Sequence, residues 1–113
     1  MITNFEEITV GLSHVEATVV LPKVIELLKY RKGKDNAITN KKIRNLLTAM
    51  GHEVHPAQIR KMIHQIRMKG LVNNLLASAK GYYVSSDKEE IEKYVTSLRE
   101  RAAAITAIAD ELE

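Results

Sequence analysis

The segment PAQIRKMIHQIRMK, from Pro56 to Lys69, contains basic and amide side chains and no acidic residue. Arginine, lysine and glutamine are residue types that pair with base edges and phosphates in a DNA groove. If this segment is a helix whose Ile59, Ile63 and Ile66 face the protein core, the 100° step per residue puts a second set of side chains on its open side and flanks. This second set comprises Gln58, Arg60, Lys61, His64, Gln65 and Arg67. The pattern favours a helix that reads DNA over a merely solvated helix, in which charges of both signs would more often alternate.

The charges of the chain are segregated along the sequence. The formal net charge is +3, but residues 23–80 carry thirteen Lys or Arg residues against three acidic residues, a net charge of +10. Residues 1–22 have a net charge of −3, and residues 81–113 have a net charge of −4. This distribution is expected if the middle of the molecule meets a polyanion, and uneven solvated charge is the alternative.

Polar residues on either side of the basic segment could contact phosphates. Lys41 and Lys42 fall in the first turn of an expected helix, where backbone N–H groups also attract anions. Ser78 and Lys80 lie between two short apolar runs, in a turn that could reach a phosphate or the minor groove. We therefore add these residues to the predicted DNA-binding set, with solvated charge as the alternative for the two helical lysines.

Several classes of function are disfavoured by what the sequence lacks. The chain has no cysteine, which excludes disulfides and thiolate metal sites and agrees with a reducing compartment. His52 and His55 are near each other, but no suitable carboxylate completes a metal ligand set. No catalytic or nucleotide-binding motif occurs, and neither a signal-peptide pattern nor a run of about 18 apolar residues is present. We expect a cytoplasmic protein that is not an enzyme, has no membrane span and uses no metal or cofactor.

The residue pattern from about 7 to 31 predicts an extended segment followed by a helix. Residues Glu7–Leu12 alternate apolar and polar side chains, which is typical of an edge strand or an extended arm. A helix is expected from about His14 to Arg31, opened by a capping box of Ser13 and Glu16 and kinked or restarted at Pro22. Its inward residues are expected to be Leu21, Val24, Ile25 and Leu28.

Two further helices and a hairpin are expected in the middle. A helix capped by Thr39 or Asn40 should run to about Ala49. The basic segment should form the next helix, because Pro56 suits a first turn and Gly70 a helix end. The apolar runs Leu71–Ala77 and Tyr82–Val84 read as two strands, joined by SAKG, in which Gly81 tolerates a positive φ.

The C-terminal segment reads as one long helix. Ser86 and Glu89 form a capping-box pattern, and no Gly or Pro interrupts the roughly 26 residues that follow. Apolar residues recur at a and d positions of a heptad, with Arg101 as the charged exception. These positions are Ile91, Tyr94, Leu98, Ile105, Ile108 and Leu112. The seam predicts either an interface between two chains or a helix folded back on the first helix.

The order of helix, short helix, turn, basic helix and hairpin is that of a winged helix-turn-helix domain. Residues 38–84, ending in KGYYV, resemble small winged-helix proteins of bacterial prophages and mobile elements, which are mostly uncharacterised. The resemblance implies that residues 38–49 form the supporting helix, residues 56–69 the recognition helix and residues 71–84 the wing. It also implies a mainly α (α+β) fold in which a long C-terminal helix follows the wing.

We therefore expect a winged-helix domain with an N-terminal arm over residues 1–86 and a dimerisation helix over residues 87–113. The expected function is sequence-specific binding of double-stranded DNA by a homodimer, as a transcriptional or replication regulator of a phage or mobile element. The alternative is an adaptor that uses the winged-helix scaffold to bind a host or phage protein without binding DNA.

Overall fold

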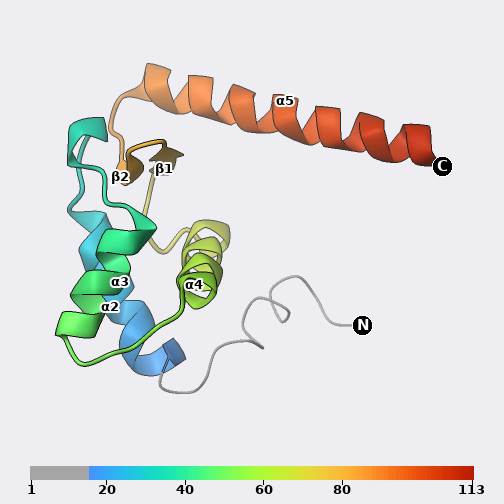
Figure 1. Cartoon of the computed structure of the whole chain (residues 1–113). Helices are drawn as coiled ribbons and strands as arrows, with labels where there is room; N and C mark the ends of the chain where they lie inside the picture. Colours follow the sequence, from blue (N-terminus) through green and yellow to red (C-terminus); the bar gives the residue numbers. More distant parts are fainter. Residues whose placement is uncertain (1–15) are drawn as a thin grey trace.

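The computed structural model describes residues 16–113 of the chain. The strand expected at Glu7–Leu12 and the capping box expected at Ser13 and Glu16 therefore lie outside what can be compared. The described part is mainly helical, with one two-stranded antiparallel sheet and a long C-terminal helix (Figure 1). Its elements are η1 (Glu16–Val20), α2 (Leu21–Lys29), η2 (Lys34–Asn36), α3 (Asn40–Ala49), α4 (Pro56–Lys69), β1 (Leu75–Ser78), β2 (Gly81–Val84) and α5 (Lys88–Leu112).

The first helix restarts at Pro22, as the sequence predicts. A five-residue π-helical turn, η1, ends at Val20, and Pro22 then occupies the first turn of α2. A proline is tolerated there because the backbone N–H it lacks would have no partner within the helix. Leu21, Val24 and Leu28 are buried, which fixes the inward face of α2.

The bounds of α3 and α4 agree with the local sequence signals. Thr39 caps α3 by accepting a hydrogen bond from the backbone N–H of Lys42 at 3.1 Å. The α4 helix begins at Pro56, and it ends before Gly70, which adopts a left-handed conformation with φ of 63°. The turn between the two helices contains Gly51, also at positive φ.

One apolar core joins α2, α3, α4 and the sheet. Side chains from all three helices are completely buried in it, and both strands add smaller contributions. The fully buried members are Val24, Leu28, Ile38, Ile43, Leu47, Ile59, Met62 and Ile66, of which Ile38 lies in the segment before α3. Because α4 contributes more than one row of these residues, its orientation relative to α2 and α3 is fixed by packing.

The hairpin is shorter than predicted and pairs with a third segment. The first strand begins at Leu75 rather than Leu71, because Asn74 adopts a positive φ of 57° just before it. Leu75 pairs with Val84, and Ser78 pairs with Gly81 across the turn. Backbone hydrogen bonds of 2.9 and 2.8 Å also join Ile38 to Tyr82, so the segment before α3 lies against the free edge of the sheet.

Gly81 is required by this edge contact. It has a φ of 119°, and a Cβ atom placed on it would lie only 2.3 Å from the carbonyl oxygen of Ile38. Any other residue would therefore push the hairpin away from the segment before α3. The sequence signal for a turn glycine is confirmed, and its second cause is this close backbone approach.

The long helix α5 is tied to the domain only near its start. Its cap is Asp87, whose carboxylate accepts hydrogen bonds from the N–H groups of Glu89 and Glu90, and not Ser86 as predicted. Glu90 in turn accepts hydrogen bonds from the hydroxyls of Tyr83 and Ser85. The pKa of the Tyr83 hydroxyl is raised, mainly because the group is partly removed from water and secondly because it donates this hydrogen bond to Glu90. These contacts set the direction in which α5 leaves the sheet.

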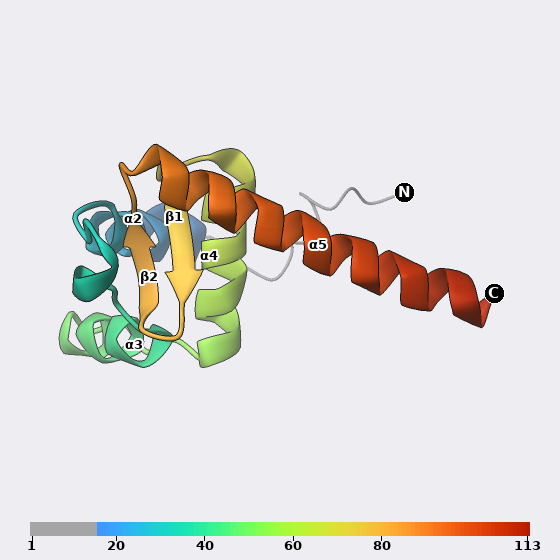
Figure 2. The ribbon, with the colours of Figure 1, turned by 90° about the horizontal axis from the view of Figure 1, so that it is seen from above.

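Beyond its first turns, α5 leaves the domain. In Figure 2 it crosses the end of α4, and in both views it continues past the body, on the side away from α2 and α3 (Figures 1 and 2). None of its 25 residues is buried. The alternative in which this helix folds back on the first helix is therefore not what the structure adopts. No helix of the described part is long and apolar enough to cross a membrane.

Candidate nucleic-acid interface

The open face of α4 carries three exposed side chains of the predicted set. Arg60, Lys61 and His64 are all exposed, and none of them makes a hydrogen bond or ion pair with another residue of the described part. Their opposite face is anchored by Ile59, Met62 and Ile66, which are fully buried. These three polar groups are thus held on a rigid helix while their ends stay available to a ligand.

Gln65 does not belong to this face. Only 5% of the residue is exposed, and its side-chain oxygen Oε1 is buried without a hydrogen-bond partner in the described part. The prediction was wrong because it centred the buried stripe on the isoleucines alone. Met62 is equally buried, and both α2 and α3 pack on α4, so the buried arc is wide enough to include Gln65.

Two other predicted residues on α4 have structural partners. Gln58 is half-buried and accepts a hydrogen bond from the backbone N–H of His55 at 2.8 Å, which closes the first turn of α4. Arg67 is exposed but donates a 2.7 Å hydrogen bond to the hydroxyl of Tyr94, and its guanidinium lies 5.8 Å from the centre of that ring. Arg67 therefore joins α4 to α5, whereas Arg60 and Lys61 have no such role.

The first turn of α3 adds a second group of cations. Lys41 and Lys42 are exposed, and their side chains make no hydrogen bond or ion pair with the described residues. They stand at a helix N-terminus, where the remaining backbone donors favour an anion. Their exposure leaves both side chains accessible to an anion, and their contact with phosphates stays a prediction.

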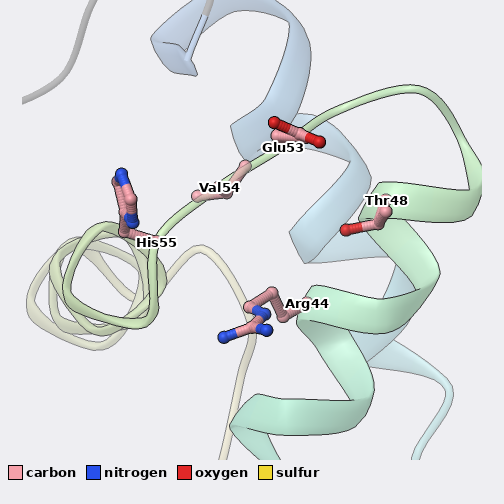
Figure 3. Close-up of a pocket in the computed structure, with 5 residues that line it drawn as sticks. All are labelled: Arg44, Thr48, Glu53, Val54 and His55. Carbon is pink, nitrogen blue, oxygen red and sulfur yellow. The ribbon is translucent and has the colours of Figure 1, made fainter.

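Arg44, which the sequence reasoning missed, extends this group towards α4. It is exposed and lines a surface hollow of about 420 Å³ together with Thr48, Glu53, Val54 and His55. Figure 3 shows its guanidinium pointing from α3 toward the first turn of α4, next to the N-cap residue His55. The spacing of Lys41, Arg44 and Thr48 along α3 was a usable signal, because such spacing puts residues on one helix face.

The hairpin contributes less to this surface than predicted. Ser78 is partly buried, and its hydroxyl oxygen accepts a hydrogen bond from the backbone N–H of Lys80 at 3.1 Å, so it stabilises the turn. The Lys80 ammonium is exposed at the tip and lies 3.2 Å from a carboxylate oxygen of Asp35. An exposed pair of this kind contributes little to stability and exchanges readily for a phosphate. Lys80 thus remains able to meet an anion, and Ser78 has a local structural role.

These elements gather at one end of the domain. The contact of Gly81 with Ile38 and the pairing of Lys80 with Asp35 hold the hairpin turn next to the start of α3. Figure 2 shows the turn at the same end as α3 and the beginning of α4. The exposed cations of three elements can therefore act on one extended ligand.

The predicted dimer residues divide into two groups along α5. Ile91 and Tyr94 are half-buried next to the domain. Farther along, Leu98 is 38% exposed, and the exposed fraction rises to 68% at Ile105 and 83% at Leu112. The predicted seam is thus one apolar stripe, and residues 16–113 leave most of it uncovered.

The described residues contain no group of His, Asp and Glu side chains that could hold a metal ion. Comparisons of the chain with protein-family models, with curated proteins and with solved structures find no match. The functional interpretation therefore depends on the geometry and charge of this surface alone.

Proposed function

We propose that the protein is a winged helix-turn-helix protein that binds double-stranded DNA, with α4 in the major groove. The observation that carries the proposal is the exposed, acid-free face of α4. On this face the side chains of Arg60, Lys61 and His64 pair with no residue of the described part, and a fully buried opposite face holds the helix in place. An α-helix fits the major groove, and these side-chain types donate hydrogen bonds to guanine acceptors or to phosphates.

The arrangement around α4 supports the winged-helix class. Two helices precede α4, a two-stranded hairpin follows it, and the segment at Ile38 pairs with the hairpin edge. This pairing ties the wing to the helices, so that its tip and α3 can contact the backbone beside the groove. Lys41, Lys42, Arg44 and Lys80 are the residues we assign to phosphates.

The proposal includes dimerisation through α5. The part of the stripe from Leu98 to Leu112 is too apolar and too exposed to be a solvated helix face. Two copies joined there would present two α4 helices, and dimeric helix-turn-helix proteins bind two half-sites in this way. In this role the protein would regulate transcription or replication of a phage or mobile element.

The direct test is a titration of the protein with fluorescent duplexes of mixed sequence at several salt concentrations. With several phosphate contacts, affinity should fall steeply and linearly on a logarithmic plot against salt. A selection of bound sequences from random duplexes then tests sequence preference. No binding to any duplex at low salt, or binding that does not respond to salt, would contradict the proposal.

A second candidate function, a protein-binding adaptor, is favoured by α5. Its exposed apolar stripe and its last turn without a basic residue do not suit contact with DNA. If α5 binds another protein, the intact chain should retain that protein at fixed stoichiometry and ignore duplex DNA. An Ile108→Glu variant should then lose the partner while its fold is unchanged.

A further inference from the structure

The starting point is a groove that α5 forms with the body of the domain. It has a volume of about 310 Å³, and Tyr94, Val95 and Leu98 of α5 form one of its walls. The facing wall comes from Val72 and the β1 residues Leu75 and Leu76. The groove is therefore mainly apolar, and the first half of the α5 stripe opens into it.

The second half of the same stripe meets no other element among the described residues. Ile105 and Ile108 are 68% and 63% exposed, and Leu112 is 83% exposed. Heptad spacing puts them in line with Tyr94 and Leu98. Each copy thus carries an apolar groove at one end of the stripe and an apolar ridge at the other end.

We propose that two copies pair their α5 helices antiparallel, so that the ridge of each copy fills the groove of the other. In this register Tyr94 of one copy lies opposite Leu112 of the other, Leu98 lies opposite Ile108, and Arg101 lies opposite Ile105. A two-fold axis then passes the helices at the level of residue 103, and the small side chains of Ala102 and Ala104, which flank the seam, let the helices approach closely. The inference rests on the proposed use of α5 as a dimer seam and is independent of DNA binding.

A parallel pair would be much less favourable. It would put Arg101 of one copy directly opposite Arg101 of the other within an apolar seam, where like charges repel. It would also require Ile91 and Tyr94 of the two copies to meet, although these residues are half-buried against their own domain. Tyr94 is further held there by its hydrogen bond with Arg67. The antiparallel pair leaves these contacts intact.

The charges at the two ends of the seam complement each other in the antiparallel pair. The last turn of α5 contains Asp110 and Glu111 and no basic residue. The groove is lined by Arg67, whose guanidinium is the nearest cation to Tyr94 at 2.7 Å from its hydroxyl. Antiparallel pairing brings the acidic end of one copy to this guanidinium in the other, whereas parallel pairing brings two acidic ends together.

The absence of native cysteine allows a direct test by single-cysteine cross-linking of the full chain. After sedimentation equilibrium has given the mass, the variants Ala102→Cys, Leu112→Cys, Leu98→Cys and Ile108→Cys are oxidised separately. In Ala102→Cys the two copies of the new cysteine should form a disulfide with each other, because both lie beside the two-fold axis. In Leu112→Cys the two cysteines are far apart and should not form one. The Leu98→Cys and Ile108→Cys proteins should cross-link when mixed and much less when alone.

The opposite pattern, in which Leu112→Cys links to itself and the mixture gains nothing, would establish a parallel pair and overturn the inference. A monomeric mass for the unmodified chain would overturn it as well, whatever the result of the DNA titration. A second measurement leaves the apolar seam untouched. Replacing Asp110 and Glu111 together by Lys should weaken the dimer severalfold at low salt, and an unchanged dimer would contradict the antiparallel charge pairing.

Discussion

Individual side chains on the proposed DNA surface should differ in what they contribute. Lys61 stands on the open face of α4, and Lys42 stands at the start of α3. We expect Lys61→Ala to relax sequence preference, with a loss of roughly 1–3 kcal/mol on the preferred duplex. Lys42→Ala should weaken binding to all duplexes equally and reduce the salt slope by about 1. Titrations on a preferred and a scrambled duplex measure both effects.

The matched control for these variants is Lys93→Ala. Lys93 is an exposed lysine on α5, paired with Glu89 at 3.3 Å, and Figure 2 shows α5 at the end of the sheet opposite to the hairpin turn. Its removal changes the net charge by the same amount, so binding should hardly change. An equal loss in all three variants would mean that total charge, and not a defined surface, determines affinity.

Gly81 makes a different prediction, which concerns stability. In Gly81→Ala the new Cβ would meet the backbone of Ile38 at 2.3 Å, in addition to the strain of a positive φ. We expect a loss of roughly 2–4 kcal/mol in the free energy of unfolding, measured by urea denaturation. Gly51→Ala is the control, because it has a φ of 90° but nothing within 4 Å, and it should cost about 1 kcal/mol. Equal losses in both variants would show that the contact with Ile38 is unimportant.

At the scale of single elements, the start of α5 offers a clear comparison between two candidate caps. Ser86 and Asp87 are both good N-cap residue types, but only Asp87 accepts hydrogen bonds from the N–H groups of the first turn. Asp87→Ala should lower stability by about 1 kcal/mol, and Ser86→Ala should change it by a few tenths at most. Thermal unfolding followed by circular dichroism measures both. A larger loss of stability in Ser86→Ala than in Asp87→Ala would show that Ser86, which the sequence pattern favours, is the cap.

The same comparison explains which elements could be predicted from sequence. The bounds of α4 follow from Pro56 and Gly70, whose backbone preferences act locally and strongly. The start of β1 could not be predicted in this way, because the apolar residues Leu71 and Val72 continue the strand pattern. The strand is interrupted by the positive φ of Asn74, a conformation that asparagine tolerates but does not require. A cap that can sit at either of two adjacent residues is equally ambiguous.

The candidate site was only partly predictable for a related reason. Helical periodicity locates the centre of a buried face but not its width, so Gln65 was assigned to the wrong side. Arg67 and Lys80 contact residues 27 and 45 positions away in the sequence, and such partners cannot be seen from local spacing. Arg60, Lys61 and His64 were placed correctly because they lie opposite the buried residues wherever the edge of the buried arc falls.

At the scale of the whole molecule, the domain and α5 divide the work that we propose. The basic, compact part carries the proposed DNA surface, and the long helix that leaves it carries an exposed apolar stripe and an acidic end (Figure 1). Separating the two surfaces in space keeps the acidic end away from phosphates. Dimerisation should therefore affect DNA binding only by joining two DNA-binding domains in one particle, because the two binding surfaces do not overlap.

This coupling predicts the effect of Ile105→Glu on the whole protein. Ile105 is 68% exposed, so a glutamate there should not unfold the domain, but it would put a charge in the seam and yield monomers in sedimentation equilibrium. DNA affinity should then fall by at least tenfold on a two-half-site duplex, because one domain must bind without its partner, while binding to a single half-site should change little. Thr106→Glu is the control, since Thr106 lies one residue away on the outer face of the heptad. Monomers that bind the long duplex as tightly as the unmodified chain would show that α5 has another purpose.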